Sequence, residues 1–88
     1  MKIVVNGCFG AYGMDVANEF KELAYSYIDD RANPKLVEFV LSHPDKCGNL
    51  CVATIPDTAT DWEISDYDGS EWVVYVKGGK IYHAYKDR

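Results

Sequence analysis

The sequence predicts a small α+β domain, in which an antiparallel-rich sheet of about five strands carries two helices on one face. Helical spacing of apolar residues is confined to positions 16–41, and strand patterns dominate from position 49 onwards. The chain has 88 residues, 48% of them hydrophobic, which fits one globular domain spanning residues 1–88. The predicted order of elements is β-α-α-β-β-β-β.

The first elements are a strand, a glycine-rich loop and a helix. Residues 2–6 hold three consecutive aliphatic side chains, which predicts a buried strand at the centre of the sheet. Glycine then recurs every third position from Gly7 to Gly13, so this loop has backbone freedom that other residues lack. Apolar residues return at helical spacing from Val16 to Ile28, after Asp15 as the expected N-cap.

A second helix and four strands complete the chain. Asn33-Pro34 has the pattern of an N-cap followed by a first-turn proline, and His43-Pro44 ends the helix because a residue before proline avoids helical angles. The pair Gly78-Gly79 indicates a tight hairpin with a primed turn. Strand patterns cover residues 50–55, 62–65, 71–76 and 81–85, with a further turn over residues 66–70.

The charge distribution favours a basic protein partner. The net charge is −5, which disfavours direct nucleic-acid binding because such affinity is built from Lys and Arg. From Pro56 to Val76 there are six acids and no Lys or Arg. Such a negative edge can steer a basic protein, although a merely solvated charge run is the alternative. The candidate partner-binding residues are Asp61, Trp62, Glu63, Asp66, Tyr67, Asp68, Glu71 and Trp72.

No metal or cofactor is expected. The three cysteines are an odd number and fit a reducing cytoplasm. Cys47 and Cys51, with His43 nearby, do not have a zinc-site spacing. The turn at Asp66 and Asp68 lacks the further oxygen ligands of a calcium loop. No apolar run approaches the roughly 20 residues of a membrane span, so no membrane partner is expected.

Catalysis is not expected either. Cys8 with His43 or His83 is the only pairing of a nucleophile with a base, and nothing in the sequence brings these residues together. The acids of the predicted hairpin would lie on an exposed turn without a cleft. The sequence therefore favours a binding protein over an enzyme.

The glycine-rich loop is an alternative ligand site. A loop between a strand and a helix can hold a phosphate with free N–H groups, and an aromatic residue there can stack on a base. The loop lacks the lysine and the spacing of a P-loop, so a purely structural turn is the competing interpretation. The candidate residues are Asn6, Gly7, Phe9, Gly10, Ala11, Tyr12 and Gly13.

Two segments resemble a family of small proteins encoded by tailed bacteriophages. The first is MKIVVNGCFGAYGMD (residues 1–15), with the family's strand followed by an Asn-x-Cys-aromatic-Gly-rich loop. The second runs from Ile55-Pro56-Asp57 to a Tyr-Asp-Gly turn at residues 67–69. The chain departs from the family at Gly7, where a basic residue is usual, and at Ala11, where a second glycine is common.

The resemblance implies a phage accessory protein in the cytoplasm of a bacterial host. Such a protein would bind a host factor, including a factor of host defence, and would inhibit or redirect it without catalysis. The alternative is a sponge that sequesters a small nucleotide signal through the Gly7–Gly13 loop. Twelve aromatic side chains exceed what a small core can hide, so a homo-oligomer is an alternative to a monomer, above all for the sponge.

Overall fold

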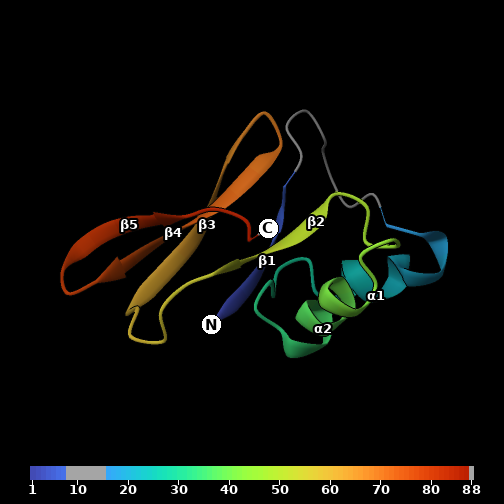
Figure 1. Cartoon of the computed structure of the whole chain (residues 1–88), viewed down its shortest axis with the longest axis horizontal. Coiled ribbons are helices and arrows are strands. Elements are labelled where there is room, and N and C mark those ends of the chain that lie inside the picture. The colour runs from blue at the N-terminus through green and yellow to red at the C-terminus, as the bar shows by residue number, and fades with distance from the viewer. Residues whose placement is uncertain (8–15, 88) are drawn as a thin grey trace.

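The computed structural model describes residues 1–7 and 16–87 and confirms the α+β class and the predicted element order (Figure 1). A short 3₁₀ helix at Asn18–Phe20 precedes α1. The described elements are β1 (Lys2–Asn6), α1 (Lys21–Ser26), α2 (Pro34–Ser42), β2 (Leu50–Thr54), β3 (Asp61–Tyr67), β4 (Ser70–Lys77) and β5 (Lys80–Ala84).

The five strands form two antiparallel sheets, where the sequence led us to expect one. β1 pairs with β2, and the other sheet has the order β3-β4-β5. Both helices lie beside β1 and β2, and the three-stranded sheet extends to the other side (Figure 1). The helices therefore cover the two-stranded sheet, whereas the three-stranded sheet packs one face against β1 and β2 and is not covered by the helices.

β1 separates the two halves of the hydrophobic core. Val4 faces the helices, in a cluster with Leu36 and Phe39 of α2. Ile3 and Val5 face the opposite way, in a cluster that includes Val73 of β4. All three β1 side chains are fully buried, and burying an aliphatic side chain of this size contributes about 1.5–3 kcal/mol. β1 is thus central to the core, but it is not the central strand of the sheet that we expected, because β2 is the only strand that pairs with it in the described chain.

The two helices differ in how far they match the sequence pattern. α2 has the expected start, since the Asn33 side chain accepts a hydrogen bond from the Lys35 amide at 2.9 Å. α1 is shorter than the helix expected over residues 16–28, and the expected N-cap Asp15 lies outside the described residues. Short helices depend on tertiary packing, and Ala24 is the one buried residue of α1.

Both hairpins have two-residue turns: the turn at Gly78-Gly79 is as expected, whereas the turn expected over residues 66–70 is shorter, because β3 extends to Tyr67 and β4 begins at Ser70. Asp68 (φ 48°) and Gly69 (φ 91°) link β3 to β4, and Gly78 (φ 59°) and Gly79 (φ 76°) link β4 to β5. Two successive residues with positive φ are typical of a type I′ turn, which fixes the register of the flanking strands. Consequently, the alternation of side chains along all three strands is also fixed.

No helix in the described ranges is long and apolar enough to cross a membrane.

Candidate protein-binding face

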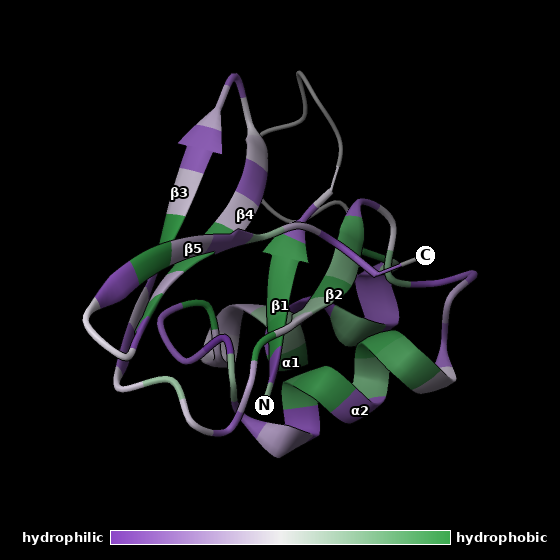
Figure 2. Cartoon of the chain, turned by 60° about the vertical axis from the view of Figure 1, so that its left-hand side comes forward, coloured by the Kyte–Doolittle hydropathy of each residue, from purple (hydrophilic) through white to green (hydrophobic). Residues whose placement is uncertain are grey.

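The three-stranded sheet has one face against the core and one face that no element of residues 1–7 and 16–87 covers. Ile64, Val73 and Ala84 pack in the core cluster, and side chains alternate along a strand, so their neighbours point the other way. Figure 2 shows the polar and apolar residues along β3, β4 and β5, with both helices away from this sheet. We call the uncovered side the outer face: Asp61, Glu63, Ser65, Tyr67, Trp72, Val74, Val76, Ile81, His83 and Tyr85.

An aromatic group lies on the outer face where the first half of β4 meets the end of β5. The Trp72 ring stacks on Tyr85 with 6.0 Å between ring centroids and on His83 at 6.5 Å. The Trp72 indole Nε1 donates a hydrogen bond to Nδ1 of His83 at 3.1 Å, so this imidazole nitrogen is an acceptor. The indole is therefore held in one orientation, while Tyr85 remains 65% exposed.

A shallow hollow of about 170 Å³ lies beside this aromatic group. Val74, Val76 and Ile81 give it apolar walls, and Asp61 and Glu63 supply carboxylates at its rim. The combination suits a long basic side chain, whose apolar stem and charged head need these two surroundings.

The structure divides the predicted partner-binding residues among different surfaces. Asp61, Glu63, Tyr67 and Trp72 lie on the outer face. The residues that alternate with these along β3 and β4 point toward the core side of the sheet. Asp68 lies in the turn between the two strands. The residues on the core side are Trp62, Asp66 and Glu71, of which Trp62 packs against the core cluster and Asp66 is exposed.

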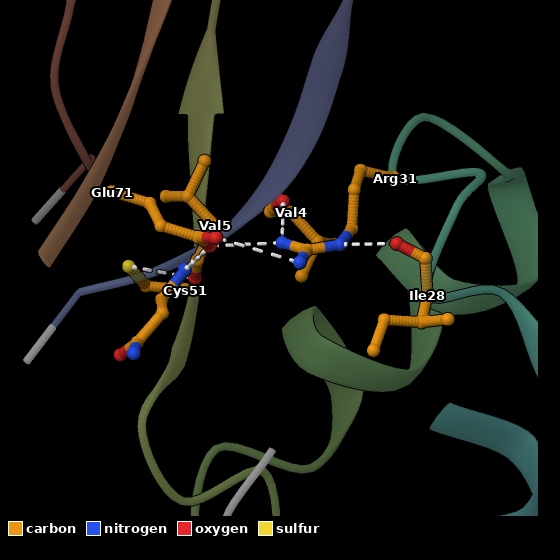
Figure 3. Close-up of polar contacts among 7 residues, drawn as sticks. Val4, Val5, Ile28, Arg31, Cys51 and Glu71 are labelled. Carbon is orange, nitrogen blue, oxygen red and sulfur yellow. Dashed lines mark hydrogen bonds and ion pairs between the residues drawn. The ribbon is translucent and has the colours of Figure 1, made fainter. Parts of the chain in front are cut away.

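Glu71 is held in the fold by hydrogen bonds to β1 and to Arg31. Its Oε1 accepts a hydrogen bond from the Asn6 amide at 2.6 Å and another from Nη1 of Arg31 at 2.9 Å. The same guanidinium donates to the carbonyl oxygens of Val4 and Ile28 (Figure 3). Because both side chains of the ion pair are more than four-fifths buried, we exclude Glu71 from the binding face. No local pattern in the sequence indicates Arg31 as the partner of Glu71.

Most of the glycine-rich loop lies outside the described residues. The candidate residues outside them are Cys8, Phe9, Gly10, Ala11, Tyr12 and Gly13. Asn6 and Gly7 are described, and their amides are already used: Asn6 donates to Glu71, and Gly7 donates to the Asn49 carbonyl at 2.9 Å. The Gly7 carbonyl accepts from Nζ of Lys86 at 2.9 Å. These two amides are therefore occupied in this structure.

Two of the candidate metal and catalytic side chains, His43 and Cys47, are packed into the fold, whereas His83 is exposed on the outer face. His43 lies against the rings of Phe20 and Phe39, at 4.9 and 5.7 Å between centroids. Cys47 is buried, and this burial raises the pKa of its thiol, which favours the unreactive neutral form. Within residues 1–7 and 16–87, no three or more His, Cys, Asp or Glu side chains gather as a metal site.

Sequence reasoning missed the contribution of β5 to the outer face. The Gly78-Gly79 turn makes Lys77 and Lys80 the first paired residues of β4 and β5. Continuing this register away from the turn places Tyr85 opposite Trp72. The hairpin signal together with the alternation of residues 81–85 could therefore have found Ile81, His83 and Tyr85.

The chain matches no protein-family model, no curated protein and no solved structure, so the outer face is interpreted from its geometry and charge.

Proposed function

We propose that this protein is a non-catalytic binding protein that docks a basic partner protein on its outer face. The observation that carries the proposal is the group formed by Trp72, Tyr85 and Ile81, which no described element covers and which borders two carboxylates. Large exposed apolar groups beside polar residues are typical of interaction sites.

Two physical properties of the face favour protein recognition. Trp and Tyr are the residue types that most often dominate binding energy, and the stacking of Trp72 lowers the entropy lost when it is ordered by a partner. The carboxylates of Asp61 and Glu63 form no ion pair within the described chain. They can therefore attract and orient a basic partner.

The resemblance to bacteriophage proteins supplies the biological setting of the proposal. The protein is an accessory protein made in the cytoplasm of a bacterial host, and its partner is a host factor. Docking on the outer face inhibits or redirects that factor by stoichiometric occupancy, and a defence factor is one such target.

Affinity capture from bacterial lysate with matched variants tests the proposal. The tag belongs at the carboxyl end, because the Met1 amino group donates to the Ile55 carbonyl at 2.8 Å. Trp72→Ser and Tyr85→Ser should each reduce the amount of one captured basic protein by roughly tenfold or more. Tyr25→Ser is the control, since Tyr25 is also exposed but lies on α1.

The salt dependence of capture is the second readout. About 0.5 M salt screens exposed charges and should release the partner from the wild-type protein. Equal capture by all four proteins, or no enriched basic protein, would count against the outer face. Native mass spectrometry separates this proposal from the nucleotide sponge, which would retain a ligand of nucleotide mass.

A further inference from the structure

One edge of the three-stranded sheet pairs with no further strand in residues 1–7 and 16–87. β3 is an outer strand, and no other strand of the described chain pairs with its second side. In a two-residue hairpin the pair next to the turn is hydrogen-bonded, so Tyr67, Ser65 and Glu63 direct their main-chain groups toward β4. The main-chain groups of Asp66, Ile64 and Trp62 consequently point away from the sheet. We call this side of β3 the β3 edge.

The outward amide of Trp62 supports this assignment. It donates to the side chain of its own neighbour, with 2.9 Å between the amide nitrogen and Oδ1 of Asp61. This local, exposed hydrogen bond can be exchanged for one to an added strand, because Asp61 can remain hydrated without it.

A pocket of about 330 Å³ runs under the β3 edge on the core side of the sheet. Trp62 and Ile64 line it from β3, and Ile28 lines it from the segment between α1 and α2. Arg31 and Glu71 also line it, but their charges are already paired with each other. Asp29 is the third charged residue of its lining, so the pocket is polar over much of its wall, and Trp62, Ile64 and Ile28 give it an apolar part next to β3. This apolar part can take up side chains that enter from a strand placed along β3.

The charges along β3 are of one sign. Asp61 and Glu63 lie on the outer face, Asp66 lies near the turn, and Asp29 borders the pocket. In residues 1–7 and 16–87 none of these four carboxylates has a basic partner. A neighbouring strand would be stabilised by basic side chains opposite Asp61 and Glu63, since opposite charges across strands attract.

We propose that the β3 edge binds an extended segment of the partner protein as a fourth strand, with alternating basic and apolar side chains. The basic side chains lie beside Asp61 and Glu63, and the apolar ones enter the pocket lined by Trp62 and Ile64. The main-chain hydrogen bonds give affinity and the alternation gives specificity. This inference rests on the proposed function and specifies the chemistry of the partner.

A second copy of this chain is a poor occupant of the same edge. Pairing β3 with β3 of another copy would bring together two strands that each carry Asp61, Glu63 and Asp66. Like charges on neighbouring strands repel, and each chain has a net charge of −5. The charges thus select a basic segment over self-association.

A synthetic peptide with the sequence Lys-Val-Lys-Val-Lys-Val-Lys is the direct probe. Titration to about 1 mM, followed by NMR of the labelled protein, should shift the amide signals of Trp62, Ile64 and Asp66 most strongly. The same peptide N-methylated at alternate residues, which lacks one set of strand donors, should bind at least tenfold more weakly. Unchanged spectra, equal binding of the methylated peptide, or concentration-dependent dimerisation through β3 would overturn the inference.

Two variants of one exposed residue test the main-chain contribution. Asp66→Pro removes an outward N–H from an outer strand, where proline is tolerated, and should weaken peptide binding at least fivefold relative to Asp66→Ala. Equal binding by these two variants, with both folded by circular dichroism, would contradict strand addition. If lysate capture still depends on Trp72 and the peptide does not bind, the edge proposal fails while the proposed function stands.

Discussion

The Arg31 guanidinium and the Glu71 carboxylate, 2.9 Å apart, close the side of β1 that β2 does not occupy. The Arg31 carbonyl accepts from the Val4 amide at 2.8 Å, its guanidinium donates to the Val4 carbonyl, and Glu71 accepts from the Asn6 amide. One ion pair thus takes the place of a neighbouring strand. It also ties β4 and the segment between the helices to the centre of the core.

Replacing Glu71 should therefore be strongly destabilising. Glu71→Ala leaves the Asn6 amide and the Arg31 guanidinium without their acceptor, and we expect a loss of about 2–4 kcal/mol in the free energy of unfolding. Urea denaturation measures the loss. The double variant Arg31→Met with Glu71→Leu leaves no unpaired charge. Its loss in the free energy of unfolding should therefore be smaller than the sum of the losses in the single variants Arg31→Met and Glu71→Leu. A single-variant loss below about 0.5 kcal/mol would contradict this role.

Gly7 should be intolerant of even a methyl group. A Cβ there would lie 2.4 Å from Sγ of Cys51 and 2.9 Å from Cδ of Lys86. The Lys86 side chain can move, but the short Cys51 side chain on β2 cannot move far. We expect Gly7→Ala to cost about 1–3 kcal/mol in thermal or urea unfolding. Combining it with Cys51→Ala should recover part of that loss, and an identical loss in both backgrounds would show that the cause lies elsewhere.

The burial of Cys47 predicts both its reactivity and a pH dependence. In a variant with Cys8→Ser and Cys51→Ser, iodoacetamide should modify Cys47 much faster in urea than in the folded protein, by roughly 100-fold. Equal rates would show that the thiol is accessible in the folded state.

The sign of the pH effect follows from the raised pKa. Burial raises the folded-state pKa of Cys47 above the ordinary value of 9.0, so the unfolded thiol ionises first. Stability is fully present below pH 9 and falls as the pH rises toward the folded-state pKa. Urea unfolding at several pH values should show a steeper fall for the wild type than for Cys47→Ala. Parallel curves would contradict the assignment.

Local signals in the sequence predicted local structure well. The Gly78-Gly79 turn and the Asn33 cap depend on a few adjacent residues, and both are confirmed. The division into two sheets was not predictable, because it depends on Arg31 meeting Glu71 across 40 positions of sequence. Local patterns do not report such pairs. The position of Trp62 on the core side of the sheet was not predictable for a similar reason. The acidic and aromatic composition of the segment does not say which face of the sheet a residue occupies until the strand register is known.

Hydroxyl-radical footprinting of the captured complex tests the outer face most directly. Trp72 and Tyr85 belong to the proposed docking surface, and Tyr25 on α1 is an internal reference with similar chemistry. The account predicts that the partner lowers the oxidation of Trp72 and Tyr85 by several-fold and leaves Tyr25 unchanged. Protection of Tyr25 with unchanged oxidation of Trp72 and Tyr85 would contradict it.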